Sequence, residues 1–424
     1  MSSQRFVVIG LARVRAPWFA EVAQWATASQ VPMDFLKCVS AGEVRARLGG
    51  ARPVSAILAD SGATGFDRDL IDEARQRGTA VIVVDDRRVD RDWIALGASA
   101  LLVPGFDRET LLESLTSHSQ PIRSVGASVT AISPPATDIE SRWRGQLIAV
   151  TGGSGSGTST VAMALAQGLS QKAGNEGAVL LADLAARADL AMYHDARDVV
   201  PGLQELVELH RSGQPAPATI RQQLFDIEQR GYSLLLGLRR SRDWTALRPR
   251  ALDAAIDSLR ASFRVTIADV DPEFDGEQET GSVDIEERNG PARTAVLGAD
   301  LVVITGDATL RGLHSLVRVQ HDLDELGVDT SNALRVVNRA PRSPRARAEI
   351  AATIAALGNR PHGLAPMFLA ERRQVETAHR VGGPLPTQLC GPLAAAATAV
   401  MARRAPAASD TDRAGTHGAE ERTR

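Results

Sequence analysis

A turn rich in glycine and serine is the part of this sequence best suited to hold an anion. It covers residues 152–157, with glycine at positions 152, 153, 155 and 157 and serine at 154 and 156. An apolar run that ends at Val150 precedes the turn, and a helical pattern that begins near Ser159 or Thr160 follows it. Backbone N–H groups can converge on an anion where such a turn opens a helix. The chemistry predicted for this turn is therefore phosphate binding.

The turn matches the phosphate-loop pattern G-x-x-x-x-G-K-[ST] at every fixed position but one. Gly152, Gly157 and Ser159 match, whereas Thr158 stands where the pattern has lysine. That lysine normally neutralises phosphate charge, and neither of the two lysines in the chain lies nearby in the sequence. A second interpretation therefore stays open, in which the turn joins a strand to a helix and binds nothing.

Two aspartates follow apolar runs that are predicted to be buried strands. Asp183 ends the run VLLAD, and Asp269 ends the run VTIAD, with Asp271 two residues further on. Carboxylates at strand ends beside a phosphate loop are where Mg²⁺ is held, with the hydroxyl of Ser159 as a further ligand. An aspartate at a strand end can also cap a helix or form a turn. The three elements in this order favour a metal and nucleotide site, with Ser159 and Asp269 as the metal ligands.

Short apolar runs alternate with helical patterns throughout the chain, which predicts the elements that position these residues. Such alternation is typical of parallel sheets with helices on both faces. The expected fold class is α/β, with two doubly wound parallel-sheet domains. The predicted strands are 6–10, 55–59, 80–84 and 100–103 in the first domain, and 146–150, 179–182, 233–236, 265–268, 301–305 and 334–337 in the second. The main predicted helices are 67–77, 107–116, 160–173, 249–262, 311–326 and 346–357.

Composition along the chain predicts where the domains end. Residues 1–119 form the first domain, residues 120–142 are a linker rich in Ser, Pro, Thr and Ala, and residues 143–403 form the second domain. Residues 404–424 are polar and are expected to be a disordered tail. The acidic segment Glu273–Arg293 is predicted to be a solvated surface loop.

Residues 145–402 resemble the MinD/ParA branch of P-loop ATPases, and most closely the CpaE/TadZ-like and actinobacterial septum-site-determining subgroup. Aligned on Gly157–Ala162, the resemblance puts Gly153 at the signature lysine of the family and Thr158 at its P-loop lysine, so both lysines are absent. Asp183 matches the first aspartate of the switch element D-x-D and is the candidate catalytic residue, while Ala185 replaces the second. Ala365–Pro386 resembles the closing strand, helix and turn of the family. The resemblance implies ATP and Mg²⁺ as cofactors, with phosphate contacts from Gly152, Gly153, Ser154, Gly155, Ser156, Gly157, Thr158, Ser159 and Thr160 and adenine contacts from Asn338 and Arg339.

The first domain resembles a response-regulator receiver that has lost its chemistry. Asp60 falls at the end of the third strand, where the phosphoacceptor of a receiver lies. Gly10 and Leu11 stand where receivers have paired acids, and Val103–Phe106 replaces their Lys-Pro segment. Without metal or lysine, phosphoryl transfer to Asp60 has little electrostatic support. We therefore expect a pseudo-receiver that serves as an interaction or dimerisation module.

The charge balance argues against a general nucleic-acid-binding or membrane-binding protein, and the two cysteines exclude a disulfide scaffold. The net charge of −3 gives no general attraction to nucleic acid or to an anionic membrane. Cys38 and Cys390 lie far apart and are interpreted as buried thiols in a reducing compartment. No signal peptide is visible, so a cytoplasmic protein is expected, with membrane association at most peripheral or through partners.

The function that the resemblance implies is spatial regulation by a nucleotide-binding protein. It would be recruited to a pole or septum and would position division, pilus or secretion machinery, with slow or absent ATP hydrolysis. Gly153 disfavours an ATP-locked dimer, so a homodimer would form through the first domain. Two alternatives remain: a non-catalytic scaffold that works only through protein contacts, and a small-molecule kinase that uses arginines in place of lysine.

Overall fold

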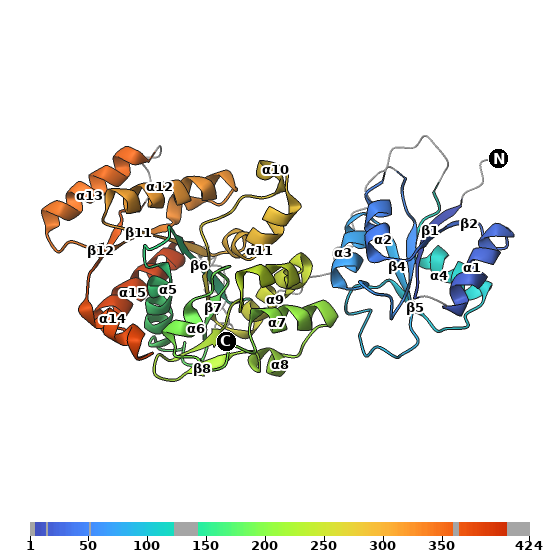
Figure 1. Cartoon of the computed structure of the whole chain (residues 1–424), viewed down its shortest axis with the longest axis horizontal. Coiled ribbons are helices and arrows are strands. Elements are labelled where there is room, and N and C mark those ends of the chain that lie inside the picture. The colour runs from blue at the N-terminus through green and yellow to red at the C-terminus, as the bar shows by residue number, and fades with distance from the viewer. Residues whose placement is uncertain (1–4, 14–15, 51, 123–142, 359–363, 405–424) are drawn as a thin grey trace, which may run out of the picture.

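The computed structural model contains two α/β units side by side, joined in the sequence between residues 122 and 143 (Figure 1). It describes residues 5–13, 16–50, 52–122, 143–358 and 364–404. Most of the predicted linker and nearly all of the predicted tail lie outside these ranges. The expected α/β class with two doubly wound sheets is confirmed.

The first unit is a five-stranded parallel sheet in the order β2-β1-β3-β4-β5, with helices on both faces. This order is that of the flavodoxin-like doubly wound folds. Its strands are β1 Phe6–Leu11, β2 Met33–Cys38, β3 Ala56–Asp60, β4 Ala80–Val84 and β5 Ala100–Leu102. Its helices are α1 Pro17–Thr27, α2 Ala41–Leu48, α3 Arg68–Gln76 and α4 Arg108–His118.

The second unit is an eight-stranded sheet in the order β13-β12-β11-β6-β10-β7-β9-β8, in which only the edge pair β8–β9 is antiparallel within the described residues. Its strands are β6 Gln146–Gly152, β7 Val179–Asp183, β8 Phe225–Ile227, β9 Tyr232–Leu235, β10 Val265–Asp269, β11 Leu301–Asp307, β12 Leu334–Ala340 and β13 Met367–Ala370. Its α-helices are α5 Thr158–Ser170, α6 Leu190–Tyr193, α7 Leu203–Ser212, α8 Pro217–Arg221, α9 Pro249–Ser262, α10 Glu277–Thr280, α11 Val283–Leu297, α12 Leu310–Glu325, α13 Pro344–Leu357, α14 Arg373–Arg380 and α15 Thr387–Arg404. Two 3₁₀ turns, Ser241–Ala246 and Thr330–Asn332, complete the described part of this unit.

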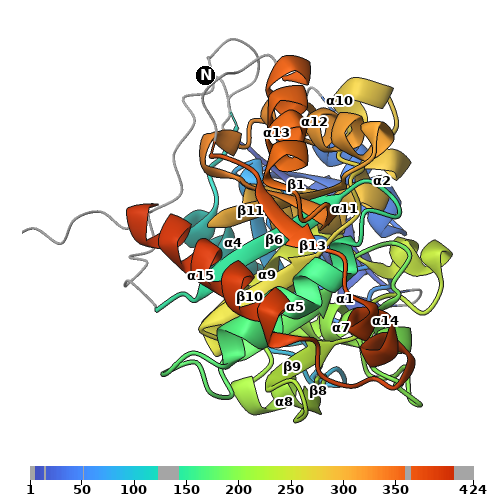
Figure 2. The ribbon, with the colours of Figure 1, turned by 90° about the vertical axis from the view of Figure 1, so that its left-hand side faces the viewer.

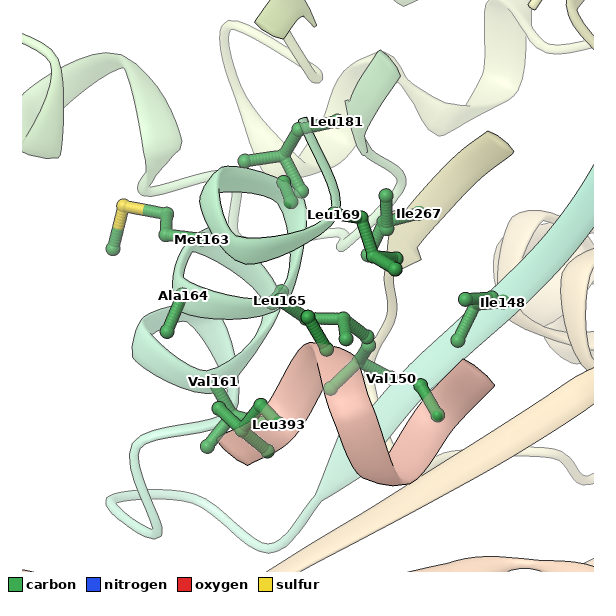
Figure 3. Packing of buried hydrophobic residues seen from close by; sticks show 14 of the residues in the cluster. Ile148, Val150, Val161, Met163, Ala164, Leu165, Leu169, Leu181, Ile267 and Leu393 are labelled. Atoms are coloured by element: carbon green, nitrogen blue, oxygen red, sulfur yellow. The ribbon is translucent and has the colours of Figure 1, made fainter. Parts of the chain in front are cut away.

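Helix α5, which follows the glycine-rich turn, is the most deeply buried helix of the site. Every residue from Val161 to Ser170 is buried, because α5 lies between the sheet and α15 (Figure 2). Figure 3 shows Val161 and Leu165 of α5 packed near Val150 of β6 and Leu393 of α15. Gly168 permits this close approach, since a Cβ there would lie 2.3 Å from the carbonyl oxygen of Cys390. A helix buried all round is fixed by packing, so its first turn is a rigid platform.

The prediction of a solvated loop at Glu273–Arg293 is wrong. This segment contains α10 and most of α11, and its residues Asn289, Pro291 and Ala292 are buried. Four of the acidic residues, Glu277, Glu279, Asp284 and Glu286, stand in the first turns of these helices, where their charge interacts favourably with the helix dipole. Pro291 lies inside α11 and interrupts the periodicity that would have revealed the helix.

The two units contact each other through α3, which packs against α7 and α9. The guanidinium of Arg68 donates hydrogen bonds to the carbonyl oxygens of His210 at 2.7 Å and Gly213 at 2.9 Å. The side-chain amide of Gln214 donates to the carbonyl oxygen of Ala95 at 2.7 Å. Within the described residues, no helix is long and apolar enough to cross a membrane.

Candidate functional site

The glycine-rich turn forms a cradle at the N-terminus of α5. Strand β6, which lies in the middle of the sheet, ends at Gly152, and α5 begins at Thr158. Gly155 and Gly157 have φ angles of 81° and 86°, which are left-handed conformations that glycine adopts without steric cost. The first N–H groups of a helix have no intrahelical partner. The start of α5 therefore presents N–H donors, and the positive end of the helix dipole, to an anion.

Asn338 and Arg339, the residues predicted to contact adenine, lie against the tip of this cradle. Nδ2 of Asn338 donates to the carbonyl oxygen of Ser156 at 3.0 Å, and Nη1 of Arg339 donates to that of Gly155 at 3.2 Å. Arg339 has a φ of 48°, which is uncommon for a residue with a side chain. The contact with Asn338 leaves no room for a Cβ at Gly157, which would lie 2.3 Å from Nδ2. The end of β12 thus holds the loop in shape.

Neither lysine position of the resembled family carries a positive charge, and position 153 is also closely packed. Oγ1 of Thr158 shares a hydrogen bond of 2.9 Å with Oγ of Ser156. A Cβ on Gly153 would lie 2.0 Å from Oγ of Ser315, on α12. A side chain at position 153 therefore requires the Ser315 side chain to move, which explains why this position suits glycine. Ser154 is exposed at the outside of the turn.

The two predicted strand-end carboxylates are direct neighbours. Strands β7 and β10 pair in parallel with Asp183 opposite Asp269, and both side chains are buried. Asp183 accepts hydrogen bonds from the N–H groups of Leu190 at 3.0 Å and Ala185 at 3.4 Å. Burial, together with the negative charge of Asp269, raises the pKa of Asp183 well above its usual range. Both carboxylates thus lie at the carboxyl ends of the strands, the same end of the sheet at which β6 leads into the cradle.

Asp269 is the carboxylate that interacts with the first turn of α5, through the hydroxyl of Ser159. Burial raises its pKa to about 7, and a hydrogen bond from the hydroxyl of Ser159 opposes that rise. Two further acids add to it, Asp271 and Asp189. Asp271 accepts a hydrogen bond from the N–H of Ala186 at 2.5 Å. Asp189 was not predicted from the sequence because it lies in the loop after β7, outside any motif.

Ser159 and Asp269 fit a magnesium ion by the chemistry of their donors. Mg²⁺ prefers oxygen ligands and is usually held by one or two carboxylates together with substrate phosphates. Within the described residues, no group of three or more His, Cys, Asp or Glu side chains could hold a metal by itself. A cation here would therefore depend on phosphate oxygens for the rest of its coordination.

Two residues that the sequence analysis did not select complete the surroundings of the cradle. His379, on α14, lies 3.1 Å from Oγ1 of Thr160 through Nε2. The ring of Tyr193, at the end of α6, packs against His379 with 4.5 Å between the ring centroids. No metal spacing or periodicity marks either residue. His379 could have been found only through the closing segment Ala365–Pro386.

The carboxylate of Asp60 in the first unit is bound by arginine. Nε of Arg13 lies 2.9 Å from Oδ1 of Asp60, and Nη2 of Arg13 lies 2.6 Å from Oδ2 of Asp86. The same guanidinium lowers the pKa of Asp86. Arg13 thus places its positive charge between the carboxylates of Asp60 and Asp86.

Comparisons with known proteins give structural neighbours but no sequence match. No family model matches the chain, and neither does any curated protein. A ParA family ATPase from Chlorobium tepidum is similar in structure at 16% identity over 60% of this chain and 99% of that chain, with a TM-score of 0.46. A Cyanothece McdA variant in complex with ATP is similar at 20% identity over 61% and 96%, with a TM-score of 0.44.

A third neighbour is the cell division ATPase MinD of Pyrococcus furiosus. It is 17% identical over 61% of this chain and 99% of that chain, with a TM-score of 0.43. These ParA and MinD ATPases are thus neighbours at low identity over about 60% of the chain. Likenesses of this strength assign neither a family nor a function, so a function has to be argued from the residues of the site itself.

Proposed function

We propose that this chain binds ATP with Mg²⁺ in the cradle formed by residues 152–160. One observation carries the proposal: Ser159 stands in the first turn of a buried helix behind a glycine-rich turn, and the strand that ends at buried Asp269 pairs directly with the strand that leads into this turn, so that the Ser159 hydroxyl lowers the pKa of Asp269. An anion-binding helix end thus lies beside a buried carboxylate. A phosphate group would bind to the helix end, and the metal ion that accompanies it would bind to the carboxylate.

Each group of the cradle has a distinct part in this proposal. The N–H groups of the turn and the hydroxyl of Thr160 bind phosphate oxygens, and Asn338 and Arg339 hold the turn and border the adenine. Ser159 and Asp269 are the residues that would hold Mg²⁺, which when bound neutralises phosphate charge. Asp183 is the candidate for orienting water, although Ala185 leaves it without the second aspartate of the resembled switch element.

Hydrolysis should be slow or absent, because neither lysine position carries a charge. The loss of one charged phosphate contact typically lowers the rate by roughly 10²-fold or more. A protein that binds nucleotide and turns it over slowly is suited to switching between two states. We therefore propose that nucleotide occupancy changes which protein partners the chain recruits.

The nature of those partners follows from the MinD/ParA resemblance of the motifs. We propose a spatial regulator that positions division, pilus or secretion machinery at a septum or pole. In this proposal residues 1–119 are a pseudo-receiver that carries partner contacts and a homodimer interface, and residues 143–403 are the nucleotide-binding domain. The CpaE/TadZ-like subgroup belongs to the same proposal.

A second candidate function is a scaffold that binds no nucleotide. The observation that favours it is the closed packing of the lysine positions, with Thr158 bonded to Ser156 and Gly153 against Ser315. In this case the cradle would only join a strand to a helix.

Calorimetric titration of the full chain with Mg·ATP and Mg·ADP, followed by a phosphate-release assay, separates the two functions. We expect binding with little phosphate release, and loss of binding in Ser159→Ala and Asp269→Asn. Ser331→Ala and Asp257→Asn change exposed residues away from the cradle and should bind like the wild type. If the wild type does not bind at millimolar nucleotide, the scaffold is the correct function.

A further inference from the structure

A histidine from the C-terminal part of the chain contacts the first turn of the phosphate-loop helix. Nε2 of His379 is 3.1 Å from Oγ1 of Thr160, and the His379 ring packs against Tyr193 at a tilt of 49°. Three segments far apart in the sequence, α5, α6 and α14, therefore meet at the residue that closes the proposed phosphate cradle.

A buried arginine fixes two of these segments. Arg230 is 1% exposed, and its guanidinium donates to the carbonyl oxygen of Tyr193 at 3.1 Å and to that of Gly383 at 3.0 Å. The first contact holds the end of α6, and the second holds the turn that follows α14. The position of the His379 ring is thus set independently of any ligand.

The surroundings of His379 determine the direction of its hydrogen bond to Thr160. Nδ1 is buried and has no hydrogen-bond partner in the part of the chain that the structure describes. A neutral imidazole carries one N–H and one lone pair. A buried N–H without an acceptor is rarer than an unfilled acceptor. The tautomer with hydrogen on Nε2 therefore fits this site, and Nε2 donates to Oγ1 of Thr160.

The ring is uncharged in this arrangement. Burial lowers the pKa of His379, the positive charge of Arg230 lowers it further, and Glu376 on the same helix opposes the shift. His194, which faces the same arginine, has its pKa lowered to about 4, mainly by burial. The neighbouring Tyr193 has its pKa raised by burial, so it too is uncharged near neutral pH.

We propose that His379 is a positioning residue for nucleotide binding: by donating to Oγ1 of Thr160, it fixes the orientation of that hydroxyl, so that the hydroxyl hydrogen points away from the ring and is donated to a phosphate oxygen. The other tautomer would accept that hydrogen on Nε2, and Thr160 would then present only lone pairs to an anion. This inference rests on the proposed nucleotide site and assigns the residue that orients one of its donors.

The tautomer can be measured without nucleotide. In the full chain labelled with ¹⁵N-histidine, the signal that His379→Gln removes is assigned to His379. We expect that signal to show hydrogen on Nε2 and a bare Nδ1. Hydrogen on Nδ1 would overturn the inference, whether or not the protein binds ATP.

Nucleotide affinity tests the consequence. His379→Gln keeps a donor near the position of Nε2, so its Kd for Mg·ATP should stay within about twofold of the wild-type value. His379→Phe keeps the ring packing but loses the donor. It should bind Mg·ATP about fivefold more weakly, which is the effect of losing one neutral hydrogen bond. In a Thr160→Val background, His379→Phe should cause no further loss. His118→Phe, at an exposed histidine of the first unit, is the control.

Two results would contradict the inference: wild-type affinity in His379→Phe, or a loss that persists in the Thr160→Val background. The second would mean that His379 acts only through packing. A wild type that does not bind Mg·ATP would refute the proposed function, and the tautomer would then show whether His379 is still set as inferred.

Discussion

At the scale of single residues, the missing lysines are the main departure from a phosphate-binding site, and their two positions are not equivalent. Thr158 is half-buried and hydrogen-bonded only to Ser156 within the described residues, whereas Gly153 is packed against Ser315. A lysine at position 158 can extend toward the anion, but one at position 153 must first displace the Ser315 side chain. The cradle therefore tolerates the restoration of one lysine and not the other.

We accordingly predict that Thr158→Lys raises the affinity for Mg·ATP by roughly tenfold, which is the effect of one charge-assisted hydrogen bond. Gly153→Lys should give no such gain and should lower the melting temperature, because its Cβ collides with Ser315. Calorimetry and thermal unfolding of both variants check this. Equal gains in affinity from the two substitutions would contradict the packing seen at position 153.

The raised pKa of Asp269 predicts how stability depends on pH when no nucleotide is present. The folded state binds this proton up to about pH 7, whereas the unfolded chain releases it near pH 4. The contribution of Asp269 to the free energy of unfolding is therefore fully present below about pH 4 and is lost as the pH rises through 7. Urea unfolding of the wild type and Asp269→Asn across this range should show the wild type losing stability relative to the variant. A constant difference between the two would refute the assigned burial.

At the scale of elements, the shape of the cradle depends on Gly157, which has a φ of 86° and contacts Asn338. We predict that Gly157→Ala destabilises the fold by about 1–2 kcal/mol from the left-handed conformation alone, and that it abolishes nucleotide binding because Asn338 must leave Ser156. Gly391→Ala, in α15 with no atom within 4 Å of the new Cβ, is the matched control and should be neutral or stabilising. Urea unfolding with calorimetry distinguishes the two variants.

Elements with a clear hydrophobic period were predictable, and elements defined by tertiary contacts were not. Helix α9 was predicted with its observed bounds, Pro249–Ser262, because its apolar stripe and its initial proline are both visible in the sequence. Strand β2, Met33–Cys38, was missed because charged residues interrupt it and only its ends are buried. The strand ends at Asp183 and Asp269 could be predicted from the sequence, but their pairing across β7 and β10 could not. His379 meets Thr160 only through the fold, across more than two hundred residues of sequence.

At the scale of the whole molecule, the contact between the two units is a polar interface rather than an apolar one. Arg68 donates two hydrogen bonds across it and Gln214 donates one, all to backbone carbonyl oxygens. The backbone N–H of Arg250 also donates to Oδ1 of Asp69 at 3.1 Å. Interfaces of this polar kind between domains are commonly weak enough to open. The surface formed by α7 and α9 is therefore covered by a contact that a few substitutions can remove.

We predict that Arg68→Ala combined with Gln214→Ala separates the units, because each hydrogen bond contributes about 1 kcal/mol and three are lost together. Small-angle scattering should then show a larger radius of gyration, and limited proteolysis should cut faster between residues 120 and 142. Arg77→Ala is the matched control, since Arg77 donates to Leu48 within the first unit, and it should leave both measurements unchanged. Nucleotide affinity should also stay unchanged in the double variant, because neither substituted residue lies in residues 152–160. A double variant with the dimensions of the wild type would mean that packing of α3, or the remaining polar contacts of Arg250 with Asp69 and Gln76 and of Arg211 with Asp67, holds the units together.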